Sequence, residues 1–254
     1  MSDPLVLTEQ KDNVFTITLN RPNKANAFNT EMLMDLQAAF KQAARKPEVR
    51  CVVLTGQGKL FSAGQDINEL QTEEAVSFRD HLRNTYNQII LQIRQLEKPV
   101  LAVINGTVAG AALGIVLACD LRIAAEGTRF VVGFLGIGLV PDSAVSLLLP
   151  QLIGLGRATE AAFSNQPISA QHALEWGLVN QLVPAEELQV VAMQVANMLA
   201  SGPTQAYGLT KRAFNRAILP DLETTLEYEA QLQEIVGRTA EHKARVAAFL
   251  EKRS

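Results

Sequence analysis

The chain has 254 residues, of which 48% are hydrophobic and 19% charged, and its formal net charge is -3. This composition is typical of a globular protein with a sizeable core, and it excludes a disordered chain, a coiled coil and a collagen-like repeat. The slight excess of acidic residues argues against a nucleic-acid-binding surface, because phosphate neutralisation needs clustered lysine and arginine.

The first half of the chain predicts alternating strands and helices. Short runs rich in aliphatic and β-branched residues predict buried strands at 14–19, 49–55, 100–104 and 121–125. Apolar residues at helical spacing predict helices between them, at 30–46 with Thr30 as the N-cap, at 72–97 and at 110–119. Strand, helix and parallel strand in succession indicate the α/β class.

The second half, from Ser143 onward, predicts helices only, at 143–151, 155–164, 169–176, 185–201, 203–217 and 221–252. We therefore expect an α/β core over 1–200 and a C-terminal helical region over 201–254. The last helix carries an apolar stripe although little core remains for it to cover, so it either packs on another subunit or folds back over the site. The stripe consists of Leu222, Leu226, Tyr228, Leu232 and Ile235.

Several classes of site find no support in the sequence. Cys51 and Cys119 lie in apolar runs and are expected to be small buried hydrophobes, not a disulfide framework. The histidines, His81, His172 and His242, are far apart and lack the spacing of metal ligands, so no metal site is expected. No signal peptide or membrane-spanning stretch is visible, and a cytoplasmic protein without membrane partners is expected.

Two segments rich in glycine and other small residues each follow a predicted buried strand. They read LFSAGQDI at 60–67 and NGTVAGAALG at 105–114, and the second leads into a helix. Small side chains let a ligand approach backbone N–H groups, and such groups are unpaired at a helix N-terminus. Two converging N–H donors make a site for a developing oxyanion. The alternative is that both segments are tight turns with close strand–helix packing. The dinucleotide-binding fingerprint fails because Phe61 stands at its third glycine position.

Together these segments resemble the enoyl-CoA hydratase/isomerase (crotonase) superfamily, and most closely its branch of ring-epoxide and enoyl-CoA isomerases of phenylacetyl-CoA degradation. The resemblance covers nearly the whole chain, including LNRP at 19–22, ACDLRIAA at 118–125, GLVP at 138–141, ALEWGLV at 173–179 and AFLEKR at 248–253. It implies a spiral of ββα units followed by a helical trimerisation region. It also implies a homotrimer or a dimer of trimers.

The resemblance also implies site residues. The oxyanion hole would be the backbone N–H groups of Ala63 and Ala111, and a neighbouring subunit would supply Phe249 for adenine stacking and Lys252 for a phosphate. Coenzyme A would enter only as part of the acyl-CoA substrate, with no separate cofactor. Its main-chain contacts would fall on Lys24, Ala25, Ala27, Ala63, Gln65, Asp66 and Ile67.

The chain departs from the hydratases of this family at two positions. Their two catalytic glutamates correspond to Gly114 and Phe134 here. Water addition needs one carboxylate to activate water and another to deliver a proton, so efficient hydratase activity is not expected. Asp142, directly after Pro141, resembles the acid of the isomerase branch. Its alternative role is that of a helix N-cap, and the two roles are compatible.

A single acid suffices for moving a double bond from C3–C4 to C2–C3, or for rearranging a ring-epoxide acyl-CoA. Asp142 would take a proton from C2 and return it elsewhere, while the two amides hold the enolate oxygen. The alternatives are a hydratase with an atypical base and a non-catalytic acyl-CoA-binding relative.

Asp120 is expected to anchor a turn and Asp66 to fix its loop by hydrogen bonds. Arg83 and Tyr86 either contact the substrate or lie on a solvated helix face, and the solvated face is expected.

Overall fold

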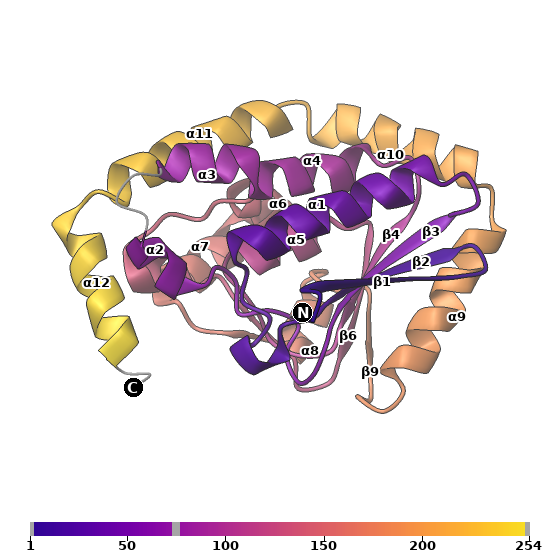
Figure 1. Ribbon diagram of the computed structural model, residues 1–254, viewed down its shortest axis with the longest axis horizontal. Helices are drawn as coiled ribbons and strands as arrows, with labels where there is room; N and C mark the ends of the chain where they lie inside the picture. The colour runs from indigo at the N-terminus through magenta and orange to yellow at the C-terminus, as the bar shows by residue number, and fades with distance from the viewer. Residues whose placement is uncertain (1–2, 73–76, 252–254) are drawn as a thin grey trace.

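The computed structural model describes residues 3–72 and 77–251, with the backbone alone at 70–72. Its main sheet has the strand order β1-β2-β3-β4-β6-β9, and Figure 1 shows it between helices on both faces. β1 is antiparallel to β2, and the other neighbours are parallel. The strands are β1 (Val6–Lys11), β2 (Val14–Leu19), β3 (Cys51–Gly56), β4 (Val100–Ile104), β6 (Leu121–Ala125) and β9 (Gln181–Val183).

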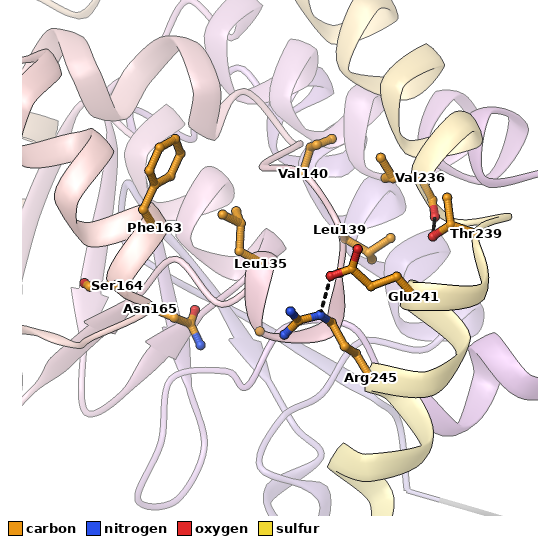
Figure 2. Close-up of a pocket in the computed structure, with 12 residues that line it drawn as sticks. Leu135, Leu139, Val140, Phe163, Ser164, Asn165, Val236, Thr239, Glu241 and Arg245 are labelled. Atoms are coloured by element: carbon orange, nitrogen blue, oxygen red, sulfur yellow. Dashed lines mark hydrogen bonds and ion pairs between the residues drawn. The ribbon is translucent and has the colours of Figure 1, made fainter.

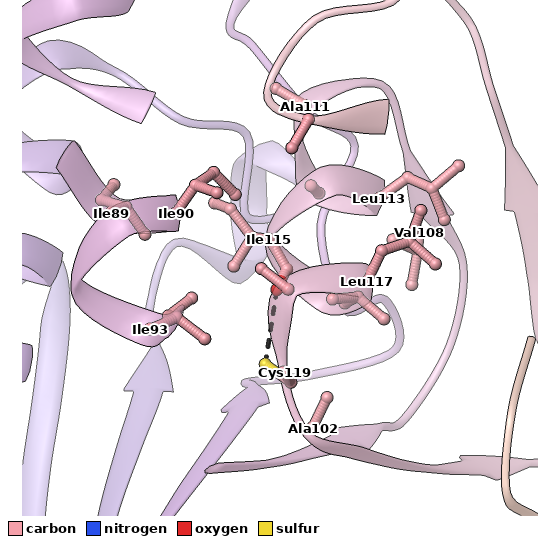
Figure 3. Packing of buried hydrophobic residues seen from close by; sticks show 14 of the residues in the cluster. Ile89, Ile90, Ile93, Ala102, Val108, Ala111, Leu113, Ile115, Leu117 and Cys119 are labelled. Atoms are coloured by element: carbon pink, nitrogen blue, oxygen red, sulfur yellow. Dashed lines mark hydrogen bonds between the residues drawn. The ribbon is translucent and has the colours of Figure 1, made fainter. Parts of the chain in front are cut away.

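The parallel strands are connected by crossover helices, as their buried, unalternating sequences require. α1 (Thr30–Arg45), α4 (Tyr86–Gln95) and α5 (Ala111–Ala118) cover one face, and α9 (Leu188–Ser201) covers the other (Figure 1). Every residue of α5 is buried, and Figure 3 shows Ile115 of this helix near the isoleucines of α4. The helix that approaches the site is therefore fixed by core packing around its whole circumference.

The predicted helix 72–97 is wrong as a single element. The structure has α2 (Ile67–Thr72), α3 (Phe78–Asn84) and α4, with residues 73–76 outside the described ranges. α3 and α4 meet at Thr85, whose φ of -119° and ψ of -90° are not helical. The predicted cap of α1 is off by one residue, since the Asn29 side chain accepts from the Met32 amide at 3.0 Å.

The second half is not wholly helical, and this corrects the prediction. β9 completes the main sheet beside β6, and β8 (Ile168–Ser169) joins β5 (Val108–Ala109) and β7 (Arg129–Val131) in a small second sheet. Strands of two or three residues carry too short a pattern to separate from helix by periodicity. The other elements are η1 (Pro22–Lys24), η2 (Leu135–Ile137), α6 (Val145–Ile153), α7 (Leu155–Ser164), α8 (Ala170–Glu175), α10 (Thr204–Ile218), α11 (Leu222–Val236) and α12 (Ala240–Glu251).

The C-terminal helices fold back over their own chain. α11 packs along α3 and against α6, and α12 contacts η2 (Figure 1). Leu222 and Leu226 of the predicted stripe are buried in this packing, whereas Tyr228 and Ile235 are 59% and 66% exposed. The stripe is therefore divided between the chain's own core and an open surface. None of the helices in the described ranges is long and apolar enough to span a bilayer.

Asp120 and the cysteines have the structural roles expected of them. Asp120 accepts the backbone N–H of Val100 at 2.8 Å and pairs with Lys211 at 2.8 Å and Arg94 at 3.2 Å, so it ties three segments together. Cys51 and Cys119 are buried and free, and burial raises the pKa of each thiol to about 12. Thiols with such a pKa are unreactive near neutral pH.

Candidate active site

The two glycine-containing segments lie side by side, as predicted. The Ser62 amide donates to Thr107 O at 3.2 Å, and the Ala109 amide donates to Ser62 O at 3.0 Å. Gly64 has a φ of +84°, and a Cβ added there would lie 2.6 Å from Ala109 O. A glycine is therefore required at this point both by the backbone conformation and by the approach of the second segment.

The loop at 21–28 is held against the same place by Asn26, which is fully buried. The Asn26 side chain donates to Gln57 O and Leu60 O, both at 2.9 Å, and accepts from the Arg21 amide at 2.8 Å. This brings the predicted coenzyme A contacts at 24–27 next to those at 63–67. Backbone bonds join the two stretches: Ala63 N to Ala25 O at 3.0 Å, Phe28 N to Gly64 O at 2.7 Å, and Asp66 N to Phe28 O at 2.8 Å.

The two amides predicted to form the oxyanion hole differ in their environment. Ala111 is the first residue of α5, and its N–H has no acceptor among the described residues. The N–H of Ala63 donates to the carbonyl oxygen of Ala25 at 3.0 Å. A thioester oxygen that uses both amides must therefore share the Ala63 proton with that carbonyl or displace it.

Asp66 fixes its loop, as predicted. Its carboxylate pairs with Arg21 at 2.7 Å and accepts from the Asn68 amide at 3.2 Å and the Asn68 side chain at 3.0 Å. Burial opposes the charge of this carboxylate, but the hydrogen bonds from Arg21 and Asn68 outweigh it and lower the pKa of Asp66. Asp66 thus remains charged and serves as a structural anchor beside the amide of Ala63.

Asp142 is buried, with 5% of its surface exposed. Gln233 Nε2 donates to its Oδ2 at 2.6 Å, and the Ser143 hydroxyl donates to its Oδ1 at 2.7 Å. Burial raises the pKa of Asp142 to about 6, although both hydrogen bonds lower it. The N-cap role is wrong for the side chain, since α6 begins after Ala144 and the Val145 amide bonds the main-chain oxygen of Asp142 at 2.9 Å. A carboxylate in this state can accept and return a proton near neutral pH.

Two buried polar side chains of α11 lie at the segment that carries Asp142, and they were not predicted from the sequence. Gln233 is 1% exposed, and its Oε1 also accepts the Val140 amide at 3.2 Å. Glu229 is 2% exposed and accepts the amides of Ala144 at 2.9 Å and Ser146 at 3.1 Å. Burial, with the nearby Asp142, raises the pKa of Glu229 to about 7. The sequence signal that could have indicated these two residues is their i, i+4 spacing along the apolar side of α11.

The two positions that carry glutamates in family hydratases cannot act as carboxylates here. Phe134 is buried in the main core. A Cβ added at Gly114 would lie 2.1 Å from Ser143 O, so the segment that carries Asp142 occupies that space. Asp142 is therefore a carboxylate placed beside the helix position from which the hydratase acid is missing.

Tyr86 is not on a solvated helix face, which corrects the prediction. It is 2% exposed, and its hydroxyl donates to Gln65 Oε1 at 2.6 Å. Burial, with contributions from the charges of Asp142 and Glu69, raises the pKa of Tyr86 above its ordinary value. Tyr86 therefore remains a protonated donor between the Gln65 loop and Asp142.

A cavity of about 510 Å³ opens next to the segment that leads to Asp142, between α7 and α12 (Figure 2). Phe163 projects from one side of it, and Arg245, paired with Glu241 at 2.9 Å, lies on the other. Phe249 lies further along α12, which packs on η2 of its own chain. Lys252 lies outside the described residues, so the role of both in a neighbouring subunit's site stays a prediction.

Comparisons with known proteins show what the chain is similar to. The family model described as enoyl-CoA hydratase/isomerase matches residues 9–254. The chain is 39% identical over 252 residues to 1,2-epoxyphenylacetyl-CoA isomerase of Escherichia coli, covering 98% of this chain and 96% of the relative. It is 34% identical to short-chain-enoyl-CoA hydratase of Clostridium acetobutylicum, covering 98% and 95%. A solved enoyl-CoA hydratase from Mycobacterium avium subsp. paratuberculosis superposes with a TM-score of 0.89 at 32% identity, covering 98% and 96%.

Proposed function

The chain belongs to the enoyl-CoA hydratase/isomerase family, and from that premise we propose that it is an acyl-CoA isomerase with Asp142 as its proton shuttle. The substrate is either a 3-enoyl-CoA, converted to the 2-enoyl-CoA, or a ring-epoxide acyl-CoA. The observation that carries the proposal is one buried carboxylate with its pKa raised to about 6, beside a position where no second acid fits.

The Asp142 carboxylate takes a proton from C2 of the thioester, and the C2–H electron pair forms the enolate. The N–H groups of Ala111 and Ala63 stabilise the enolate oxygen, with the Ala25 carbonyl giving up part of its bond to Ala63. Protonated Asp142 then returns the proton at C4, so atoms and charge balance. For a ring epoxide, the bond between the two epoxide carbons breaks as the ring expands to a seven-membered cyclic enol ether. The same proton transfer from C2 to C4 then moves its β,γ double bond into conjugation, so the product has the formula of the substrate.

The hydrogen bonds to Asp142 support this role. Gln233 and Ser143 hold both carboxylate oxygens, which fixes the orientation of the group. Burial keeps the pKa near the working pH, where a group transfers protons in both directions most effectively. A carboxylate of ordinary pKa would be a weaker base, and one without partners would not be oriented.

Self-association belongs to the same proposal. Large apolar side chains are exposed on α7, α10 and α11, among them Leu155, Phe163, Phe214, Ile218, Tyr228 and Ile235. An apolar surface of this kind supports association between copies, and a homotrimer or hexamer is the expected form, with Phe249 and Lys252 entering the neighbour's site. Light scattering measures the mass against that of the 27.6 kDa chain.

The test incubates the protein with 3-hexenoyl-CoA and with crotonyl-CoA. We expect conjugated 2-enoyl-CoA from the first and no added water on the second, and Asp142→Asn should lose at least about 10²-fold in rate. Asp221→Asn is the control, because Asp221 is exposed and its side chain makes no capping bond. Hydration of crotonyl-CoA would instead favour a hydratase. Tight binding without turnover would favour a non-catalytic relative.

A further inference from the structure

The side chain of Gln65 ends in a small polar cluster. Gln65 Oε1 accepts the Tyr86 hydroxyl at 2.6 Å and lies 3.3 Å from His81 Nε2. The Tyr86 ring contacts Phe28 and His81 edge to face, with centroids 5.9 Å apart in each pair. The residues come from the loop after β3, from α3 and from α4, so three elements fix one amide.

This cluster lies next to the atoms proposed to react. In the loop from Ser62 to Ile67, residues 62, 64 and 66 are buried and residues 63, 65 and 67 are half-buried. Gln65 lies two residues beyond Ala63 in this loop, and both residues are half-buried. On the other flank, the Tyr86 hydroxyl is close enough to Asp142 for the charge of that carboxylate to act on it. The Gln65 amide thus belongs to the same region of the molecule as the proposed oxyanion donors and the proposed base.

One atom of this amide is unsatisfied. Gln65 Nε2 is buried and has no hydrogen-bond partner in the described part of the chain. Tyr86 keeps its proton and donates it to the amide oxygen, which leaves the NH₂ group as the free donor. Burying such a donor without an acceptor is unfavourable, and a site built around one discriminates strongly between ligands that supply an acceptor and those that do not.

We propose that Gln65, positioned by Tyr86, selects acyl-CoA substrates that carry an oxygen acceptor on the acyl group, by donating a hydrogen bond from Nε2 to that oxygen. The inference rests on the proposed function only in taking the surroundings of Gln65, Ala63 and Asp142 as the site of the acyl group. The chemical class is a ring epoxide or cyclic ether joined to the thioester, in preference to a hydrocarbon acyl group of the same shape. Gln65 would then act through its side chain as well as through main-chain contacts to coenzyme A.

Binding of two unreactive isosteres tests this without requiring catalysis. 2-Methoxyphenylacetyl-CoA and 2-ethylphenylacetyl-CoA differ by one ether oxygen and have nearly the same shape, and calorimetry gives their Kd values. We expect the wild type to bind the methoxy compound at least about fivefold more tightly. Gln65→Met, which keeps the length of the side chain, should abolish the preference, and Tyr86→Phe should reduce it. Gln171→Leu, an exposed glutamine on α8, should leave it unchanged.

The outcomes separate this inference from the proposed function. Equal affinity of the wild type for both compounds, or a preference that survives in Gln65→Met, would overturn the role of Gln65 while leaving the acyl-CoA site intact. Equal weakening of both compounds in Gln65→Met and Tyr86→Phe would also overturn it, because a purely structural role predicts that result. Failure of both compounds to bind the wild type would overturn the proposed acyl-CoA site itself.

Discussion

The carbonyl oxygen of Ser143 lies where a side chain at Gly114 would begin, since a Cβ added at Gly114 would be 2.1 Å from it. Ser143 and Ala144 adopt positive φ values of 55° and 64°, so the segment after Asp142 bends sharply toward α5. The presence of the aspartate and the absence of the helix glutamate are therefore two aspects of one packing arrangement. A chain that keeps this segment in place has no room for the hydratase acid.

Gly114→Ala should consequently destabilise the protein by about 1–3 kcal/mol and lower isomerase activity, because the displaced backbone carries Asp142. Gly156→Ala is the matched control. Gly156 lies in α7, nothing lies within 4 Å of a Cβ added there, and the change should be neutral or slightly stabilising. Thermal unfolding and 3-hexenoyl-CoA turnover measure both effects. Gly114→Glu should gain no hydration of crotonyl-CoA, and a hydratase created by this change would contradict the packing argument.

The pH dependence of turnover should report the Asp142 carboxylate. Because its pKa is raised to about 6, kcat/KM should rise with pH through that value and level off above it. Gln233→Leu removes a hydrogen bond that lowers this pKa, so the acidic limb should move to higher pH. Gln231→Leu, an exposed change on the same helix, should leave the limb in place. An unshifted limb in Gln233→Leu would show that Gln233 does not set the charge of Asp142.

Asp142→Asn should stabilise the protein at alkaline pH. The folded pKa is raised from 3.8 to about 6, so the folded state binds more protons than the unfolded chain between these values. The contribution of Asp142 to the free energy of unfolding is therefore fully present below pH 3.8 and is lost as pH rises through 6. An asparagine at this position causes no such loss. At pH 8 the variant should be more stable by on the order of 2–3 kcal/mol, and less so at pH 4.5. Thermal midpoints at both pH values check this, and a pH-independent difference would contradict it.

The donor role of the Ala111 amide can be isolated by Ala111→Pro. Ala111 is the first residue of α5, where proline suits the helix and removes the N–H without breaking an intrahelical hydrogen bond. Loss of one oxyanion donor should lower kcat by about 10²–10³-fold with little change in helix content. Circular dichroism checks the fold, and stopped-flow spectroscopy measures turnover. Full activity in a folded variant would exclude this amide from the reaction.

Much of the fold could be predicted from the sequence because the signals for these strands and helices lie within short segments of the chain. The strands at 14–19, 100–104 and 121–125 have the predicted ends, since each is a buried apolar run between clear turn signals. The short strand β9 was missed because three residues carry no detectable period. The break between α3 and α4 was missed because Thr85 interrupts an otherwise continuous apolar pattern without a glycine or proline.

The site was less predictable for a physical reason. Asp142 and the two glycine-containing segments stand in recognisable local contexts, and the segments do meet. Gln233 and Glu229 carry no local motif, because their meaning depends on α11 reaching back to residues some 90 positions earlier. Likewise, nothing in the local sequence indicates that the Ala25 carbonyl bonds the Ala63 amide.

The hydrogen bond between Gln233 and Asp142 spans 91 residues of chain. During synthesis on the ribosome, the aspartate emerges long before the helix that orients it. A nascent or prematurely terminated polypeptide that stops before α11 therefore contains the acid and both glycine-containing segments but lacks the Gln233 hydrogen bond and the burial that α11 provides. Such fragments should be inert toward thioesters. Activity would then appear only after the C-terminal helices have been synthesised.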